Sequence, residues 1–264
     1  MAGRYAKLTE KRIAKLEREG RGKGVGKDYT PWIKTNDLSS LGRVHRRLSI
    51  VSDRVVHLLS DIEEDVFLSF DEHPDTLDIR EQFPLPRLET IAIAERLGVR
   101  HPMVNGVPVV MTTDLLIDMR GYRLALAVKP ADKLADRRTL EKLDIEKTYW
   151  TERPNVRWAL VTDGSVSRSA RIGMQERADW GHARLVEADT TRAWRWMSDV
   201  MLVAIADRPR GRLNEFCARV EAREGWDRGT GLSAVKLLLA RHLVVLVGTE
   251  RLDPFADASQ LALA

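Results

Sequence analysis

Apolar residues take up a helical rhythm after Ser60, where Ile62, Val66 and Phe70 recur at every fourth position. This spacing places an apolar stripe along one face of a helix. Ser60 and Glu63 have the spacing of a capping box, and the acidic residues of the first turn suit the positive end of the helix dipole. The pattern therefore predicts a helix that begins near Ser60.

Two shorter elements are predicted after this helix. Leu77–Phe83 alternates weakly between apolar and polar residues and predicts a short strand, which Pro84 ends. Ile91–Leu97 predicts a short helix closed by Gly98.

Two further apolar runs, Thr113–Met119 and Arg123–Lys129, predict the two strands of a hairpin. A loop of Gly121 and Tyr122 fits a type II′ turn, which takes glycine first. With that turn Asp114 lies directly opposite Lys129, and directly opposed residues share a face with Cβ atoms about 5 Å apart. The inference depends on the turn, because a slip of one residue would place the two side chains on opposite faces.

The rest of the pattern divides the chain into an α/β part and a helical part. An amphipathic helix at Asp136–Trp150 and an apolar strand at Val156–Thr162 indicate a crossover between parallel strands, and hence a mixed sheet flanked by helices. We expect a basic N-terminal segment at 1–27, an α/β domain at 28–165 and a smaller domain at 166–264. The last domain follows the order of a winged-helix module, with helices at Thr190–Ala206, Leu213–Arg223 and Leu232–Ala240 and a strand at His242–Val247.

Basic residues are concentrated near the N-terminus, although the whole chain carries a net charge of only +4. Residues 1–47 hold thirteen Lys and Arg against five Asp and Glu, so the remainder of the chain is acidic. A basic arm ahead of an acidic body favours a polyanionic partner over a purely solubilising tail. The candidate contacts to DNA are Lys23, Lys27, Arg43, Arg46 and Arg47.

The glycine-rich stretch at 20–27 does not have the pattern of an ATPase phosphate-binding loop. Lys27 is followed by Asp28 rather than by Ser or Thr, and Arg21 stands where the first glycine should be. We therefore expect a flexible basic segment here, with a helix at Lys7–Glu19 ahead of it.

Other classes of protein are disfavoured by what the sequence lacks. No apolar run reaches the roughly 18 residues of a membrane span, and the first residues lack the apolar stretch of a secretion signal. Cys217 is the one cysteine, so no internal disulfide forms. These features fit a cytoplasmic protein, which a DNA substrate would bring to the nucleoid.

Four groups have the chemistry that phosphodiester hydrolysis needs. Mg²⁺ prefers oxygen ligands and keeps several waters. The carboxylates of Glu63 and Asp114 and the backbone carbonyl of Val128 would supply such ligands, and Lys129 would orient the attacking water or stabilise transition-state charge. A simpler interpretation stays open for each group: Glu63 as the glutamate of a capping box, and Asp114 with Lys129 as a cross-strand ion pair.

Two more residues are candidates for supporting roles around this site. His57 lies shortly before Glu63, where a structural hydrogen bond is favoured over metal ligation. Glu146 lies on the helix after Lys129, where its side chain either faces the site or is a solvated helix charge. No group of His and Cys has the spacing of a zinc site.

Several stretches of this sequence resemble the TnsA family, the endonuclease subunits of the heteromeric cut-and-paste transposases of Tn-seven-like elements. They run in order through residues 18–163, and several are long and unusual. The matching stretches are Glu19–Trp32, His57–Glu63, Leu77–Leu85, Met111–Asp114, Val128–Ala131 and Arg138–Leu143.

The resemblance implies a restriction-endonuclease-like catalytic domain, a winged-helix-like C-terminal domain, and catalytic positions at Glu63, Asp114 and Lys129. It implies cleavage of the 5′ strand at transposon ends with Mg²⁺, for which Mn²⁺ is a substitute. The implied partners are transposon-end DNA, an integrase-type transposase (TnsB) and an AAA+ ATPase (TnsC). One position departs from the family pattern, because Ala127 stands where a glutamine is common, two residues before the lysine.

Two other functions remain as alternatives. A stand-alone restriction or defence nuclease would share the fold and the carboxylates, but would cut DNA without a partner. A non-catalytic DNA-binding adaptor would need only the basic arm and the winged-helix domain.

Overall fold

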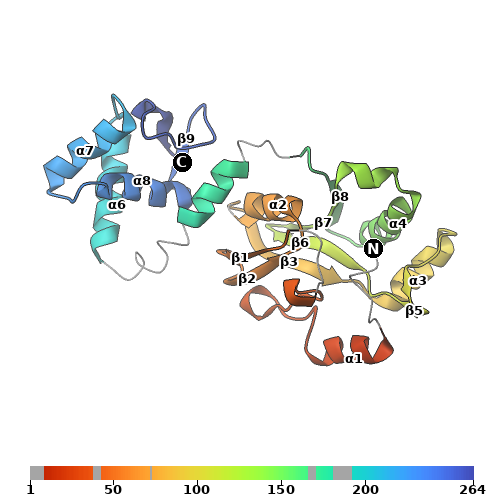
Figure 1. Cartoon of the computed structure of the whole chain (residues 1–264). Coiled ribbons are helices and arrows are strands. Elements are labelled where there is room, and N and C mark those ends of the chain that lie inside the picture. Colours follow the sequence, from red (N-terminus) through yellow and green to blue (C-terminus); the bar gives the residue numbers. More distant parts are fainter. Residues whose placement is uncertain (1–8, 38–42, 72, 166–170, 181–191) are drawn as a thin grey trace. The chain divides into compact units, whose positions relative to one another are not determined.

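The computed structural model describes residues 9–37, 43–71, 73–165, 171–180 and 192–264. The chain forms two compact units, residues 1–166 and 167–264 (Figure 1). No helix among the described residues is long and apolar enough to cross a membrane. Each unit is described in turn.

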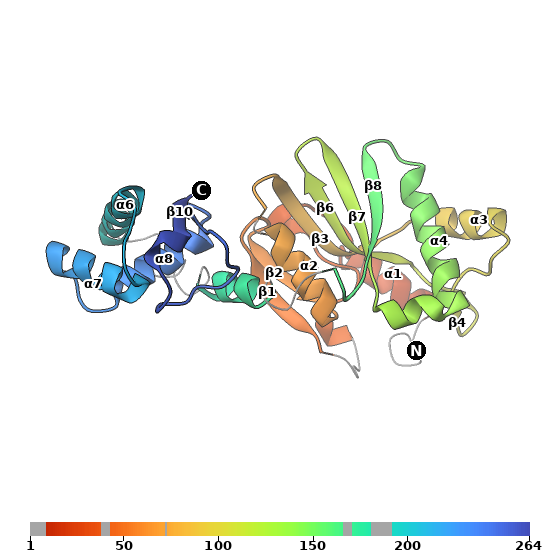
Figure 2. The same cartoon turned by 90° about the horizontal axis from the view of Figure 1, so that it is seen from above.

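The first unit is built on a four-stranded mixed sheet with the strand order β3-β6-β7-β8 (Figure 2). The pairs β3–β6 and β6–β7 are antiparallel, whereas β8 pairs with β7 in parallel after a crossover through α4. The predicted α/β class with a mixed sheet flanked by helices is therefore confirmed. The elements of the sheet and its crossover are β3 (Thr76–Pro84), β6 (Thr112–Met119), β7 (Tyr122–Val128), α4 (Arg137–Thr151) and β8 (Val156–Val161).

The β6–β7 hairpin forms as predicted, but its turn and register differ from the prediction. Met119 pairs with Tyr122, so Arg120 and Gly121 form the two-residue loop, and the pairing continues to Leu115 with Leu126. One step further along, Asp114 lies opposite Ala127 rather than opposite Lys129. The register is shifted by two residues, and because side chains alternate with a period of two, Asp114 and Lys129 still share a face.

Helices cover the sheet and bring polar residues to its edge. The helix α4 packs on the face that carries Leu116 and Ala125, through Ile145, Tyr149 and Trp150. The helix predicted after Ser60 forms as α2 (Asp61–Asp71), and it packs against β3 and β6. The remaining elements of this unit are β1 (His45–Ser49), β2 (Arg54–Leu58), α3 (Arg87–Arg96), β4 (Met103–Val104) and β5 (Val107–Pro108).

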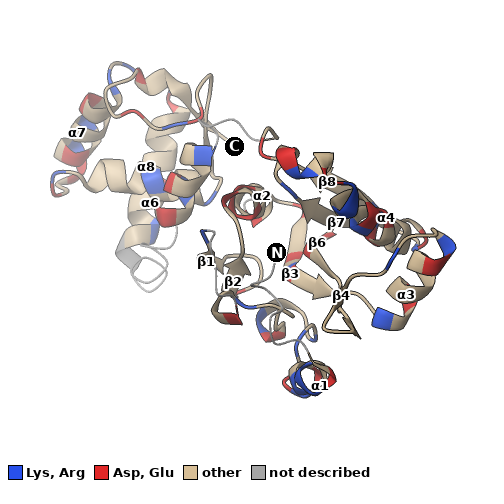
Figure 3. Cartoon of the chain, turned by 45° about the vertical axis from the view of Figure 1, so that its right-hand side comes forward, with Lys and Arg blue, Asp and Glu red and all other residues tan. Residues whose placement is uncertain are grey.

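The N-terminal segment packs on this unit. The helix predicted at Lys7–Glu19 forms, and the prediction of a flexible segment after it is wrong. Thr9 caps α1 (Glu10–Arg18), whose exposed face carries both acidic and basic residues (Figure 3). Ile13 and Leu16 on its other face are buried in an apolar cluster with Trp32 and Val110. In the sequence, the many basic residues around this narrow apolar stripe obscured it. The stripe packs the helix on the sheet domain.

The glycine-rich stretch after α1 is also held in place. The amide of Gly26 donates to Asp78 Oδ2 at 2.9 Å, and the amide of Gly22 donates to the carbonyl of Thr30 at 2.6 Å. A Cβ atom at Gly22 would lie 2.1 Å from Pro84 Cγ, so the backbone packs directly on the end of β3. Close packing, rather than flexibility or phosphate binding, accounts for glycine at this position.

The second unit is mainly helical, as expected. Met201, Phe216, Val235 and Leu261 belong to its buried core. Residues 171–180 of this unit are helical. They are followed by the helices α6 (Arg192–Ala206), α7 (Leu213–Glu224) and α8 (Thr230–Ala240), and then by a two-stranded sheet of β9 (Val244–Leu246) and β10 (Leu261–Leu263). Helices followed by a small antiparallel sheet have the order of a winged-helix module, and that assignment stays a prediction. Thr190, expected at the start of α6, lies outside the described residues.

Candidate active site

Asp114 and Lys129 meet at the end of the β6–β7 hairpin. Asp114 Oδ2 accepts hydrogen bonds from Lys129 Nζ at 2.5 Å and from the backbone amide of Val128 at 2.8 Å. Lys129 Nζ also donates to the backbone carbonyl of Val128 at 2.8 Å. An ammonium cation therefore lies between two of the three oxygens that the sequence proposes as metal ligands.

The carboxylates around Lys129 favour its charged form. Burial alone would lower the pKa of the ammonium group, but the negative charges of Asp114, Glu146 and Glu63 outweigh burial and raise the pKa above its ordinary value. In the metal-free chain Lys129 is thus a positive charge rather than a proton acceptor at neutral pH.

Glu63 makes the capping-box contacts of the simpler interpretation, and its carboxylate also lies at the candidate site. It is buried in the first turn of α2, and its amide donates to Ser60 Oγ at 3.1 Å, as in a capping box. Its carboxylate accepts from the Ser60 hydroxyl at 3.2 Å and from the Leu59 amide at 2.9 Å. These capping contacts fix a carboxylate that also faces the end of β3.

Gln82 on β3 joins the two carboxylates, and no local pattern in the sequence singles it out. Its side-chain amide donates to Glu63 Oε2 at 3.4 Å and to Asp114 Oδ1 at 3.3 Å. The pairs Glu81–Leu115 and Phe83–Thr113 place Gln82 at the level of Asp114 on the neighbouring strand. A prediction of the β3–β6 register could have identified it, but the hydrophobic pattern fixed only the β6–β7 hairpin.

Glu146 is buried at the site, so the interpretation as a solvated helix charge is wrong. The side chain is 5% exposed. One turn further along α4, Trp150 Nε1 donates to Thr113 Oγ1 at 2.6 Å and ties the helix to the strand residue next to Asp114. Burial and the charge of Asp114 raise the pKa of Glu146 to about 8, although Lys129 opposes this shift.

His57 is held by a different part of the unit. Its Nδ1 atom accepts from the backbone amide of Thr35 at 3.3 Å and lies 3.0 Å from the Thr35 hydroxyl. Burial lowers the pKa of His57 to about 4, together with nearby positive charges, of which Arg46 has the largest effect. These contacts give His57 the structural hydrogen bond that the sequence favoured, and do not bring its ring to the Glu63–Asp114 pair.

The candidate DNA contacts fall into two groups. Lys23 and Lys27 are exposed on the glycine-rich stretch. Arg43 and Arg46 are exposed on or beside β1, which lies next to the start of α2, whereas Arg47 bonds Glu64 Oε1 at 2.6 Å. The structure thus places the β1 arginines nearer to the helix that carries Glu63, and leaves Arg43 and Arg46 the more accessible of them.

The comparisons with known proteins agree with this architecture. A family model described as "TnsA-like endonuclease N terminal" matches residues 73–163. The protein "Transposon Tn7 transposition protein TnsA" of Escherichia coli is 35% identical over 247 residues, which cover 92% of this chain and 88% of that protein. The chain belongs to the TnsA-like endonuclease family. Asp114, Lys129 and Glu146 lie within the part that the family model matches, and Glu63 lies ahead of it.

The oxygen donors of this TnsA-like site suit a hard cation such as Mg²⁺. No group of three or more His, Cys, Asp or Glu side chains among the described residues has the arrangement of a metal site. The groups at this site that would hold a cation are the carboxylates of Glu63 and Asp114 and the carbonyl of Val128, together with water. Such a donor set, with few protein ligands and only oxygens, is the kind that Mg²⁺ accepts.

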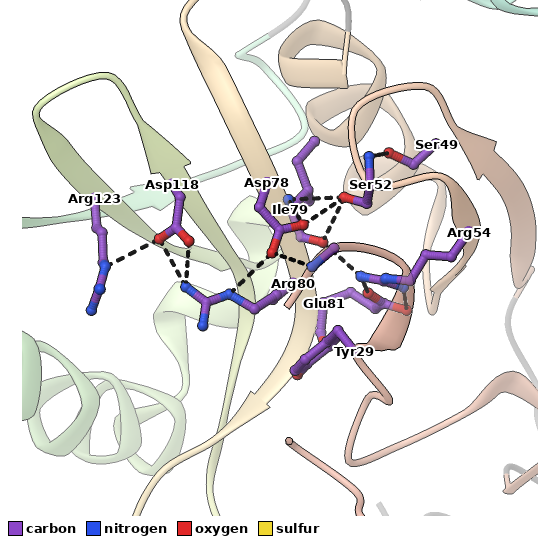
Figure 4. A network of polar contacts seen from close by, with 11 residues as sticks. Tyr29, Ser49, Ser52, Arg54, Asp78, Ile79, Arg80, Glu81, Asp118 and Arg123 are labelled. Atoms are coloured by element: carbon purple, nitrogen blue, oxygen red, sulfur yellow. Dashed lines mark hydrogen bonds and ion pairs between the residues drawn. The ribbon is translucent and has the colours of Figure 1, made fainter. Parts of the chain in front are cut away.

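A large cavity elsewhere in the TnsA-like unit belongs to a different region. Its volume is about 830 Å³, and it lies at the turn end of the β6–β7 hairpin, where its lining includes Asp78, Asp118 and Arg123. Figure 4 shows that these carboxylates are engaged: Asp118 bonds Arg80 and Arg123, and Asp78 bonds Ser52. Asp114 lies at the other end of β6, so the cavity is not the candidate active site.

Proposed function

We propose that this TnsA-like chain is the transposon-end endonuclease subunit of a heteromeric cut-and-paste transposase, and that it hydrolyses the 5′, non-transferred strand with Mg²⁺. Membership of the family supports a DNA endonuclease that acts in transposition. The observation that carries the proposed site is the convergence of Glu63, Asp114 and the Val128 carbonyl around Lys129 and Gln82.

The chemistry of each group follows from its place. Glu63, Asp114 and the carbonyl of Val128 would hold Mg²⁺, which lowers the pKa of bound water and stabilises charge on the phosphate. Lys129 keeps a positive charge beside Asp114, where it would orient the attacking water or neutralise the charge that develops on the phosphate oxygens. Glu146 is buried next to this centre and adjusts its electrostatics.

The proposed partners follow from the role of the subunit. We propose that an integrase-type transposase cuts and joins the 3′ ends, and that an AAA+ ATPase regulates the assembly through the C-terminal unit of this chain. The exposed residues Lys23, Lys27, Arg43 and Arg46 are proposed DNA contacts, since cations that meet phosphates release counterions and strengthen binding. Arg47 would reach DNA only by leaving Glu64.

A strand-resolved cleavage assay tests this function. Transposon-end DNA labelled separately on each strand is incubated with Mg²⁺, the partner transposase and ATPase, and either the wild-type chain or Asp114→Asn. We expect the variant to lose 5′-strand cutting while the partner's 3′-strand cutting persists. Asp132→Asn, at an exposed carboxylate, is the matched control and should cut normally.

Two results would favour the alternatives. Robust cleavage of plasmid DNA by the purified chain alone would support a stand-alone nuclease. Normal 5′-strand cutting by both Asp114→Asn and Lys129→Ala, with DNA binding that does not respond to Mg²⁺, would support a non-catalytic adaptor.

A further inference from the structure

Gln82 combines complete burial with an uncommon backbone conformation. Its side chain is fully buried, at 0% exposure. Its backbone has a φ of +47°, in the left-handed region that residues other than glycine adopt rarely. Such a conformation persists only where the surrounding structure imposes it, and it concentrates at functional sites.

The neighbouring contacts show what imposes this conformation. The carbonyl of Gln82 accepts from the amide of Trp32 at 3.3 Å. The preceding residue, Glu81, is held by Arg54 through two bonds of 2.9 and 2.6 Å, and its carbonyl accepts from the Tyr29 hydroxyl at 3.0 Å (Figure 4). The end of β3 is thus anchored on β2 and on the segment that follows the glycine-rich stretch.

The side chain of Gln82 is oriented as well as placed. Its Oε1 atom accepts from the Thr112 hydroxyl at 3.2 Å, so its amide group points at the carboxylates of Glu63 and Asp114. The two donor hydrogens of one amide group suit one hydrogen bond to each carboxylate. Both distances exceed 3.2 Å, so each bond is weak, and the contribution of the amide lies in setting the spacing of the two carboxylates.

A neutral donor suits a site that must later receive a cation. Two buried carboxylates repel each other, and an amide between them reduces this repulsion with its dipole. A lysine or arginine in this place would cancel the negative charge that attracts the metal. Asp114 already has one cationic partner in Lys129, so a second would leave little net attraction for a divalent ion.

We propose that Gln82 is a positioning residue that presets the Glu63–Asp114 pair for a divalent cation. The inference rests on the proposed function, because it assumes that these carboxylates hold the metal. Gln82 acts through the two carboxylates and needs no direct contact with DNA. Groups that orient metal ligands in this way typically change metal affinity about 10–100-fold when they are removed.

The experiment is a calorimetric titration of the metal-free full-length chain with Mn²⁺ alone. Gln82→Leu keeps the approximate volume and removes the amide, and we expect its Mn²⁺ affinity to fall about 10–100-fold. Gln82→Asn shortens the amide so that it no longer spans both carboxylates, and we expect a similar loss. Asparagine adopts left-handed backbone more readily, so this second variant retains the fold if the leucine variant does not.

Matched controls separate this role from a general loss of structure. Gln260→Leu makes the same chemical change in the C-terminal unit and should leave Mn²⁺ affinity unchanged. Gln82→Asn should retain the melting temperature of the metal-free wild type within a few degrees. A high Mn²⁺ concentration should restore its 5′-strand cutting, which a distorted active site would not regain.

The possible outcomes are distinct. Equal Mn²⁺ affinity in the wild type and in folded Gln82 variants would overturn this inference and leave the proposed function standing. A wild-type chain that takes up no Mn²⁺, or takes it up equally after Asp114→Asn, would contradict the metal site of the proposed function and remove this inference with it.

Discussion

Lys129 Nζ lies 2.5 Å from Asp114 Oδ2 and 2.8 Å from the carbonyl oxygen of Val128, so one ammonium group bridges both oxygens. A metal ion held by the same two oxygens must compete with this ammonium or displace it. A substitution of Lys129 should therefore affect the metal affinity and the cleavage rate of the site differently. Removal of Asp114, by contrast, would abolish both.

The first prediction concerns Lys129→Met, which keeps an unbranched side chain and removes the charge. We expect 5′-strand cutting to fall about 10²–10³-fold, because a charge that stabilises the transition state is lost. The affinity for Mn²⁺ should not fall, because a competitor for the metal's oxygens is gone. Strand-resolved kinetics and calorimetry measure the two effects, and the exposed Lys133→Met serves as the control. Wild-type cutting by Lys129→Met would reduce Lys129 to an ion-pair partner.

The second prediction concerns the buried pair of Arg54 and Glu81, whose side chains are 7% and 0% exposed. Arg54→Met leaves a buried carboxylate without its cation and should lower the free energy of unfolding by about 3–5 kcal/mol in urea titrations. Arg96→Met, which removes an exposed ion pair with Glu152, should cost less than about 1 kcal/mol. Equal stabilities of the two variants would contradict an anchoring role for the buried pair.

The third prediction concerns the attachment of α1. Ile13→Ala removes a side chain that is 3% exposed and should destabilise the first unit by about 2–4 kcal/mol. Lys15→Ala, two residues further along on the exposed face, should change stability by less than about 0.5 kcal/mol. Denaturant unfolding measures both values. If Ile13→Ala matches Lys15→Ala, the apolar face of α1 does not hold the helix on the first unit.

The fourth prediction concerns pH and His57, whose pKa falls from 6.5 to about 4 on folding. The unfolded chain binds the proton between these values and the folded chain does not, so the stabilising contribution is complete above pH 6.5 and is lost as the pH falls toward 4. We expect a loss of about 1–2 kcal/mol, since solvent screening at this half-buried ring reduces the full linkage. The positive neighbours that oppose protonation are Arg46, Lys34, Arg54 and Arg21.

The measurement for His57 is a series of urea titrations of the wild-type chain and of His57→Asn. The chosen conditions are pH 7.5, 6, 5 and 4.5. Other groups titrate in this range, so the difference between the two chains is the informative quantity. The stability of the variant should depend less steeply on pH. Parallel curves would mean that His57 remains accessible to protons in the folded chain.

Local patterns predicted α2 and the strands and crossover helix of the four-stranded sheet, because each depends on neighbours in the sequence, but they did not predict the short strands β1, β2, β4 and β5. The helix after Ser60 needs only its apolar rhythm and its cap, and the β6–β7 hairpin needs two apolar runs and a glycine. The face shared by Asp114 and Lys129 was predicted correctly even though the register was not. An error of two residues preserves the face, whereas the distance between two side chains depends on the register itself.

Contacts between distant segments could not be read from local patterns. Gln82 reaches Glu63 and Asp114 only after β3 pairs with β6, and its left-handed backbone has no signature in the hydrophobic pattern. Glu146 resembles any charged helix residue until α4 packs on the sheet. Ile13 and Leu16 form too short a stripe to outweigh the basic residues around them in the sequence.

The division of the site among α2, β3, β6 and β7 has a consequence for the chain during synthesis. Glu63 and Lys129 are separated by roughly half of the first unit, and β7 gains its second neighbour only when β8 is in place. A nascent chain that has not yet emerged past β8 lacks the completed sheet that brings these side chains together. The candidate site therefore forms only after the chain has been synthesised beyond Val161, the last residue of β8, and a product that ends before β8 lacks it.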